Sequence, residues 1–262
     1  MNVKLYKGDC LKEMDNIPDK SVNLVLCDLP YGKTKNSWDM PIDLEELWKQ
    51  YKRVCTDDAA ILLFAQGSFY IDLVCSNRKM FRYDLVWDKM MSTGFLNANR
   101  MPLRNHEQIA VFYKKMPKYN PQFHKGNPLH GRNENNVFEN RQTTYGNFKI
   151  LPAKKGNTDK YPLSVIKIPK YHPSDCMHPT EKPIELLKYL ILSYSDEGDT
   201  VLDNCMGCGS AGLASVVTER NFIGIELDEG FYDKAEKRIL SAKKVSDGRK
   251  KMLKLREEGK IV

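Results

Sequence analysis

The amino-acid sequence predicts an α/β fold built on an open, mostly parallel sheet. Short apolar runs that suit buried strands alternate with segments of helical periodicity along residues 22–113 and 183–240. A glycine-rich turn near residue 207 stands between one such strand and one such helix. With 262 residues, of which 41% are hydrophobic, the chain can bury one sizeable core and support a smaller appended lobe.

The individual elements follow from the spacing of apolar side chains. Strands are predicted where short apolar runs end at polar residues, over 22–27, 59–64, 83–87, 108–113, 200–203 and 222–226. Helices are predicted over 43–54, from 68 to about 78, from 183 onward, after the 207–212 turn and over 232–240. Ser68 is expected to cap its helix, and Pro183 suits the first turn of the next one.

The basic charge is concentrated in two segments. The net charge is +7, and residues 115–175 contain eleven Lys/Arg against four Asp/Glu. Residues 243–262 contain eight Lys/Arg against three Asp/Glu. Two basic segments on an otherwise balanced chain favour a polyanionic partner, although solvated surfaces explain either segment alone.

Residues 114–175 lack sustained periodicity and are rich in Asn, Pro, Lys and aromatic residues. A structureless loop of this length is unusual inside a compact domain, so a separate small lobe or a lid is predicted.

The seven cysteines do not form a pattern typical of a disulfide framework or a zinc site. Cys205 and Cys208 have C-x-x-C spacing, but no second pair or histidine pair follows nearby, so no metal site is predicted. No apolar stretch approaches the ~20 residues of a membrane span, and no secretory signal is recognised. A cytoplasmic protein without membrane contact is therefore expected.

The turn 207–212 (Gly-Cys-Gly-Ser-Ala-Gly) has the G-x-G-x-x-G pattern. Gly207 permits a tight turn, and Gly209 allows close approach of a ligand to the backbone. Glu226 ends the next strand, 19 positions after Gly207, where a carboxylate can accept hydrogen bonds from ribose hydroxyls. This arrangement predicts an adenosine-containing cofactor and leaves both NAD and S-adenosylmethionine open. A tight turn without a ligand is the structural alternative.

The stretch 28–31 (Asp-Leu-Pro-Tyr) follows a predicted buried strand and should lie at the edge of the sheet where open α/β folds bind ligands. An exocyclic amine on a base is a poor nucleophile, because its lone pair is delocalised into the ring. Asp28 and a backbone carbonyl fixed by Pro30 can accept its two N–H bonds. Tyr31 can stack on a base, which contributes roughly 1–3 kcal/mol. An ordinary strand-ending turn explains these four residues equally well.

Taken together, four stretches resemble the amino-group DNA methyltransferases, which methylate adenine N6 or cytosine N4. The catalytic motif of the family, Asp/Asn-Pro-Pro-Tyr/Phe, resembles Asp28–Tyr31, and its motif Asp-Pro-Phe-x-Gly-Ser-Gly-Thr resembles residues 203–210. The family stretch His-Pro-Thr-Gln-Lys-Pro resembles residues 178–183 (His-Pro-Thr-Glu-Lys-Pro), and the family stretch Gly-Asp-Cys/Ala resembles residues 8–10. The chain departs from these patterns at several positions, among them Leu29 for the first proline and Cys208 for a serine. Trp38 and Asp39 are similar to phage-borne members, and the family includes restriction-modification enzymes.

The order of the motifs, catalytic before cofactor-binding, resembles the permuted β group of this family. The resemblance implies a Rossmann-like S-adenosylmethionine-dependent methyltransferase fold with an inserted target-recognition lobe. It divides the chain into a catalytic half (1–114), a recognition insert (115–176), a cofactor-binding half (177–242) and a basic C-terminal tail (243–262). Double-stranded DNA is the implied partner, a homodimer is common in this group, and neither a metal nor a covalent enzyme intermediate is needed.

The resemblance also implies roles for individual residues. Asp28, Pro30 and Tyr31 form the catalytic set, and the implied cofactor-binding set is Asp9, Cys10, Asp28, Lys182, Asp203, Cys205, Gly207, Gly209, Ser210 and Glu226. Within this set Glu226 takes the ribose, Asp9 and Cys10 border the adenine, and Lys182 lies near the cofactor carboxylate. The pair His106-Glu107 is left out of the catalytic set, because a structural role is at least as plausible.

Several alternatives stay open. Asp28, where cytosine-N4 enzymes tend to have serine, favours adenine N6 as the target over cytosine N4. The chain has no Pro-Cys dipeptide, which argues against a cytosine-C5 enzyme. An NAD-dependent dehydrogenase would explain Gly207–Gly212 and Glu226 but not the other motifs. A DNA-binding protein without catalysis is a third class, and the Asp28–Tyr31 motif speaks against it.

Overall fold

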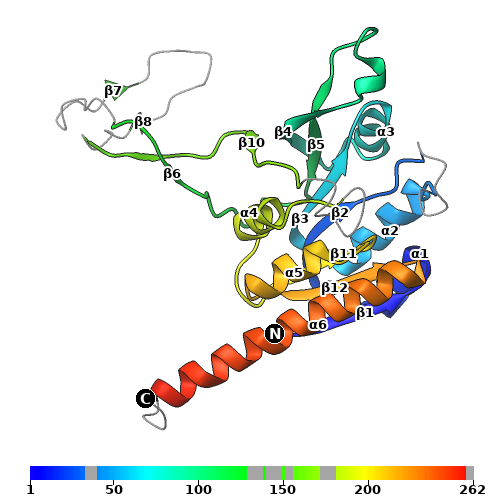
Figure 1. The fold of residues 1–262 in the computed structure, drawn as a ribbon, viewed down its shortest axis with the longest axis vertical. Helices are drawn as coiled ribbons and strands as arrows, with labels where there is room; N and C mark the ends of the chain where they lie inside the picture. Colours follow the sequence, from blue (N-terminus) through cyan, green and yellow to red (C-terminus); the bar gives the residue numbers. More distant parts are fainter. Residues whose placement is uncertain (33–39, 129–137, 140–148, 151–155, 172–180, 258–262) are drawn as a thin grey trace. The chain divides into compact units, whose positions relative to one another are not determined.

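The computed structural model describes residues 1–32, 40–128, 138–139, 149–150, 156–171 and 181–257. The chain divides into two compact units, of which the first comprises Met1–Asn120 with Ser164–Val262 and the second comprises Pro121–Leu163. The first unit contains a large twisted sheet with helices packed against it (Figure 1).

Eight strands form the sheet of the first unit, and seven of them run parallel to a neighbour. Their order is β1 (Val3–Lys7), β12 (Asn221–Glu226), β11 (Thr200–Asp203), β2 (Val22–Asp28), β3 (Cys55–Ala65), β5 (Arg104–Phe112), β4 (Phe81–Thr93) and β10 (Val165–Lys167). Only β5 pairs antiparallel with both of its neighbours. The predicted mostly parallel α/β sheet is thereby confirmed.

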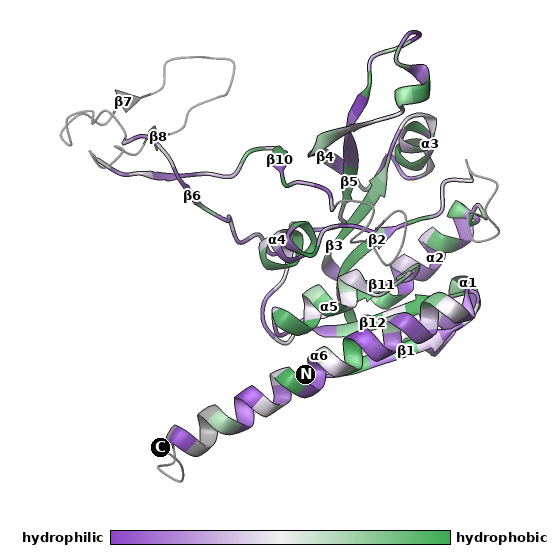
Figure 2. Cartoon of the chain, viewed as in Figure 1, coloured by the Kyte–Doolittle hydropathy of each residue, from purple (hydrophilic) through white to green (hydrophobic). Residues whose placement is uncertain are grey.

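Both faces of the sheet are buried, because alternate residues of the central strands enter two separate hydrophobic clusters. In β2, Val25 and Cys27 belong to one cluster, whereas Leu24 and Leu26 belong to the other. The first cluster includes residues of α1 (Cys10–Glu13), α2 (Leu44–Val54) and α3 (Ser68–Ser76), and the second includes residues of α4 (Ile184–Tyr194), α5 (Ser210–Val217) and α6 (Glu229–Glu257). Figure 2 shows β3 in the hydrophobic colour between these helices.

Helix starts agree with the sequence at α2 but not at α3. Asp43 caps α2, since its carboxylate accepts hydrogen bonds from the backbone N–H groups of Glu45 and Glu46. The prediction that Ser68 caps α3 is wrong, because Ser68 is the first helical residue and Gly67 precedes it. Gly67 has φ +61, a conformation that glycine adopts without strain as the chain turns out of β3.

Several elements are longer than predicted or were not predicted. β4 and β5 continue past the apolar runs into a hairpin that carries the short 3₁₀ helix η2 (Phe95–Asn97). β1 at the sheet edge, α1 and the 3₁₀ helix η1 (Met14–Asn16) were not predicted. α6 extends to Glu257, so most of the predicted tail 243–262 continues this helix, consistent with its Lys, Arg, Leu and Met content.

The second unit is shorter than the predicted insert 115–176. Lys115 donates its backbone N–H to the Asp57 carbonyl at 3.1 Å, and β10 pairs with β4, so both ends of the predicted insert belong to the first unit. The described part of the second unit contains two antiparallel pairs of two-residue strands, β6 (His124–Lys125) with β9 (Asp159–Lys160) and β7 (Phe138–Glu139) with β8 (Lys149–Ile150). Strands this short leave no periodic signal in the sequence.

Within the described ranges, none of the helices combines the length and the apolar character needed to cross a membrane.

Candidate active site

The carboxyl ends of three adjacent strands open onto one cleft. Asp28, Asp203 and Glu226 are the last residues of β2, β11 and β12, which lie side by side in the sheet. From β2 the chain continues to β3 on one side, and from β11 it continues to β12 on the other, so the cleft lies where the strand order reverses. Its volume is about 700 Å³. Residues more than 170 positions apart in the sequence therefore meet at one site.

All but one of the predicted site residues line this cleft. The lining residues among them are Asp9, Cys10, Asp28, Pro30, Tyr31, Lys182, Asp203, Cys205, Gly207, Ser210 and Glu226. Gly209 is not among the lining residues, and its predicted contact with a ligand stays a prediction. A β-carbon at Gly209 would lie 2.8 Å from Ile239 Cδ1 and 2.9 Å from Ala235 Cβ, so this glycine is needed for packing against α6.

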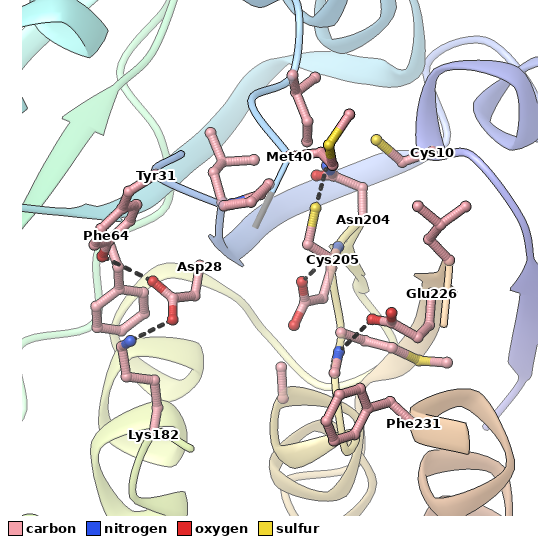
Figure 3. Close-up of a pocket in the computed structure, with 18 of the residues that line it drawn as sticks. Cys10, Asp28, Tyr31, Met40, Phe64, Lys182, Asn204, Cys205, Glu226 and Phe231 are labelled. Atoms are coloured by element: carbon pink, nitrogen blue, oxygen red, sulfur yellow. Dashed lines mark hydrogen bonds and ion pairs between the residues drawn. The ribbon is translucent and has the colours of Figure 1, made fainter. Parts of the chain in front are cut away.

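Asp28 lies at one end of the cleft with both carboxylate oxygens engaged (Figure 3). The Tyr31 hydroxyl donates to Oδ1 at 2.9 Å, and the Lys182 ammonium donates to Oδ2. The Tyr31 ring stacks on Phe69 with 4.8 Å between centroids. Burial raises the pKa of Asp28 above its ordinary value, and the charge of Lys182 opposes this shift.

Lys182 immediately precedes Pro183, the N-cap of α4, and its ammonium lies between two carboxylates rather than at the glycine-rich turn. Besides Asp28, it forms an ion pair with Glu107 Oε2 at 3.3 Å, and it lies 5.0 Å above the Phe64 ring. Its predicted place near a cofactor carboxylate stays a prediction, and the contacts in this structure are with the catalytic half. Glu107 was left out of the predicted site, and its partners identify it as part of the same charged cluster.

The glycine-rich turn and Glu226 form the opposite end of the cleft (Figure 3). Gly207, with φ +52, directs its backbone N–H to Glu226 Oε2 at 2.8 Å. The backbone N–H of Asp228 donates to Oε1 of the same carboxylate at 2.8 Å. These two bonds fix the Glu226 carboxylate and leave lone pairs on both oxygens for a ligand. Phe231 also lines this end and was not predicted.

Asp203 lies between the two ends of the cleft and is almost fully buried. Burial raises its pKa to about 7, although the backbone N–H of Cys205 donates to its Oδ1 at 3.1 Å. Nearby, a thiol hydrogen bond with Cys205 lowers the pKa of Cys10, whereas burial raises that of Cys27 to about 12. The Asp9 carboxylate caps α1 through the Leu11 N–H at 2.8 Å, which orients the chain at the cleft rim.

A buried carboxylate stabilises the start of α5. Ser210 donates its hydroxyl to Glu181 Oε1 at 2.9 Å, and Arg238 of α6 donates to the same oxygen at 2.7 Å. Ser210 is therefore oriented by Glu181, which stands where the resembled motif has glutamine. No pattern in the sequence indicated that Arg238 of α6 contacts the Glu181 carboxylate.

Some predicted features lie outside the described residues. These are His178, Pro179 and Thr180 of the His-Pro-Thr-Glu-Lys-Pro stretch, together with Trp38 and Asp39. Among the residues that the structure does describe, no group of three or more His, Cys, Asp or Glu side chains is placed to hold a metal ion.

Comparison with known proteins places this arrangement among the DNA methylases. The chain is 27% identical over 271 residues to the DNA adenine methyltransferase YhdJ of Escherichia coli K12, covering 98% of this chain and 89% of that protein. It is 26% identical to the type II methyltransferase M.HinfI of Haemophilus influenzae, covering 91% of this chain and 68% of that protein.

Two solved structures show the same fold. The M1.HpyAVI–SAM complex matches with a TM-score of 0.61 and 21% identity, covering 90% of this chain and 98% of that one. The cytosine-N4-specific PvuII DNA methyltransferase matches with a TM-score of 0.66 and 15% identity, covering 94% and 91%. The predicted Rossmann-like methyltransferase fold is thereby confirmed. Residues 22–237 match the profile of the DNA methylases that modify N6 or N4 amino groups, and the chain belongs to this DNA methylase family.

Proposed function

We propose that this protein transfers a methyl group from S-adenosylmethionine to adenine N6 in double-stranded DNA. The observation that carries the proposal is the position of Asp28, which ends β2 at the same cleft as the glycine-rich turn and Glu226. A carboxylate here can accept an N–H of a target amino group while a cofactor occupies the other end. The aspartate at position 28 favours adenine over cytosine as the target base. The similarity to a relative named as a DNA adenine methyltransferase favours adenine as well.

The cofactor end of the cleft fits S-adenosylmethionine by the chemistry of its groups. The Glu226 carboxylate, which is held by two backbone N–H groups, suits hydrogen bonds from ribose hydroxyls. Phe231 and Cys10 offer apolar surface for the adenine. The Asp203 carboxylate, near the turn at Gly207, suits the positive charges of the methionine end. When bound, S-adenosylmethionine would supply an electrophilic methyl group from its sulfonium, and S-adenosylhomocysteine would be the leaving group.

The residues of the catalytic end prepare the amine for attack. Asp28 and a backbone carbonyl near Leu29 or Pro30 accept the two N–H bonds and increase electron density on nitrogen. Transfer of the methyl group to nitrogen would break the carbon–sulfur bond of the cofactor and release one amino proton to solvent. The base must leave the duplex, at a cost of a few kcal/mol, and stacking on Tyr31 would offset part of this. Tyr31 would exchange its contact with Phe69 for the base.

The decisive test is to incubate the protein with unmodified DNA and methyl-labelled S-adenosylmethionine, digest the DNA, and identify the labelled nucleoside. Label on N6-methyladenine is expected. Label on N4-methylcytosine would keep the mechanism and change the target. Absence of label, with cofactor binding demonstrated by calorimetry, would contradict methylation of DNA and favour a binding protein without catalysis.

Cofactor affinity is expected to increase with pH because of Asp203. Its pKa of about 7 means that the carboxylate is protonated below this pH and ionised above it. Ionised Asp203 attracts the cationic methionine end, so affinity measured by calorimetry should rise several-fold from about pH 5.5 to about pH 7.5. The Asp203→Asn variant should show a flat profile. Adenosine, which lacks the methionine end, is the matched ligand control, and an equal pH dependence for adenosine would refute this role.

The second unit and α6 are proposed to contact DNA. The predicted insert 115–176 is basic. Among its described residues, Phe123, Tyr161 and Lys125 are exposed, and such side chains are suited to contacts with bases and phosphates. We assign sequence recognition to this unit. A homodimer, which the resemblance implies, stays a prediction that sedimentation equilibrium can test.

Removing positive charge from the end of α6 is expected to weaken DNA binding at every sequence alike. Lys244, Arg249 and Lys251 are exposed on this helix. Glutamine has nearly the helix propensity of lysine and arginine, so their triple replacement by glutamine should retain the helix. Each lost phosphate contact should reduce the slope of log affinity against log salt by about 0.9. A matched triple variant, in which the exposed Lys4, Lys12 and Lys52 become glutamine, removes the same charge elsewhere. Equal effects of both variants would contradict a specific role of α6.

A further inference from the structure

One aspartate, one glutamate and two lysines form a series of ion pairs with alternating charge at the catalytic end of the cleft. Asp28 pairs with Lys182, Lys182 with Glu107 at 3.3 Å, and Glu107 with Lys89 at 3.3 Å. Asp28 and Lys182 both line the cleft, and Asp28, at the end of this series, lies near the proposed position of the target amine. Lys89 is 3% exposed, Lys182 8% and Glu107 9%.

Four separate segments of the chain supply these charges. Lys89 lies on β4 and Glu107 on β5, and the antiparallel register that pairs Trp87 with Glu107 brings them together. Asp28 ends β2, and Lys182 comes from the residues before α4. Burying four ionised groups is costly unless each is paired, and here each positive charge lies between or beside negative ones. The arrangement therefore fixes the position of Lys182 through contacts on both sides.

We propose that Lys182 is a positioning residue for methyl transfer, which holds the Asp28 carboxylate ionised and oriented toward the target amine, with Glu107 and Lys89 holding Lys182 in turn. This inference rests on the proposed function, because it concerns the same carboxylate. It gives Lys182 a task in the catalytic end of the cleft instead of at the cofactor carboxylate. Lys182 forms no bond with the reacting atoms and acts only through Asp28.

The two neighbours of Asp28 act on it in opposite directions. The positive charge of Lys182 lowers the pKa of Asp28, whereas the negative charge of Glu107 raises it, as does burial. The other groups that face this cluster are the Tyr31 hydroxyl, which favours ionised Asp28, Asp203, which disfavours it electrostatically, and Lys170 beside Lys89. Because ionised Asp28 is the active form, the rate should fall as pH decreases through its pKa.

The fall in rate toward low pH forms the acidic limb of the pH–rate profile. The proposal predicts that two variants shift this limb in opposite directions. In Lys182→Met, loss of the positive charge should move the limb to higher pH by about 1–3 pH units, as expected for loss of a buried charge partner. In Glu107→Gln, loss of the negative charge should move it to lower pH. The double variant should fall between them. Lys182→Arg, which retains the charge, should restore the limb to near its wild-type position even if its maximal rate is lower.

The experiment measures methyl transfer to DNA at saturating cofactor across pH, with thermal melting and cofactor calorimetry on each variant. Opposite shifts with cofactor affinity retained would support the proposal. An unmoved limb in folded Lys182→Met, or a loss confined to cofactor affinity, would overturn it. If Lys182→Met is inactive or unfolded, Glu107→Gln decides alone, since an unmoved limb there is equally contrary.

A failure of the proposed function gives a different result. In that case the wild-type protein binds cofactor but labels no DNA base. The titration of Asp28, followed by carbon-13 NMR of aspartate-labelled protein, then tests the effect of Lys182 on its ionisation without relying on turnover.

Discussion

Replacing Asp28 by asparagine is expected to lower the rate of methyl transfer by about 10³-fold, within the range typical of removing a positioned acid or base. Asparagine has nearly the shape of aspartate but only one accepting oxygen. Since the Lys182 ammonium donates to Oδ2, the amide oxygen should turn toward Lys182 and place the amide NH₂ toward the target. A donor would then face the N–H groups of the substrate, and the target nitrogen would lose its acceptor.

Single-turnover kinetics with saturating DNA and cofactor measure this loss directly, and calorimetry should show cofactor affinity within a few-fold of wild type. Asp57→Asn is the matched control. Asp57 is a surface carboxylate that pairs with Lys20, Lys114 and Lys115, away from the cleft, so its loss should leave the rate unchanged. A wild-type rate in Asp28→Asn would exclude the proposed role of this carboxylate.

The sequence allowed most of the central sheet to be predicted, because its strands are buried on both faces. Val22–Cys27 and Ala59–Phe64 are continuous apolar runs, and such runs are typical of central parallel strands. The edge strand β1 was missed, since Val3–Lys7 mixes charged and apolar residues and pairs only with β12. Its strand conformation depends on a partner more than 200 positions away, which local pattern cannot reveal.

The candidate site was predictable where a short motif contains the chemistry. Asp28, Asp203 and Glu226 each end a buried strand, so local pattern was enough to place them at the same sheet edge. The ion pairs of Glu107 with its neighbouring lysines were not predictable in this way. Glu107 lies in the polar first half of β5, and only the register of β4 with β5 and the approach of residue 182 show that its partners are lysines.

Gly209 illustrates a residue type predicted for one reason and required for another. The G-x-G-x-x-G pattern suggested close approach of a ligand at this position. In the structure its φ is +79, and the space where a side chain would lie is occupied by Ala235 and Ile239 of α6. The pattern detects a glycine without distinguishing a ligand from a packed helix.

Gly209→Ala is therefore expected to destabilise the protein by about 3 kcal/mol. The left-handed conformation costs a residue with a β-carbon about 1–2 kcal/mol, and overpacking against α6 adds about 1–3 kcal/mol. The closest contacts include the Ala235 α-carbon at 3.1 Å, which is backbone and cannot rotate away. Because the same turn positions Gly207 and Ser210, cofactor affinity should fall as well.

Gly94→Ala separates the two causes. Gly94 has φ +86, close to that of Gly209, but a β-carbon there would meet no atom within 4 Å. Its loss of stability should therefore be about 1–2 kcal/mol, from backbone strain alone. The free energies of unfolding from urea titrations, compared between the two variants, give the contribution of packing against α6. Equal losses would mean that α6 yields to the added methyl group, and the tight contact of Gly209 would then add nothing to stability.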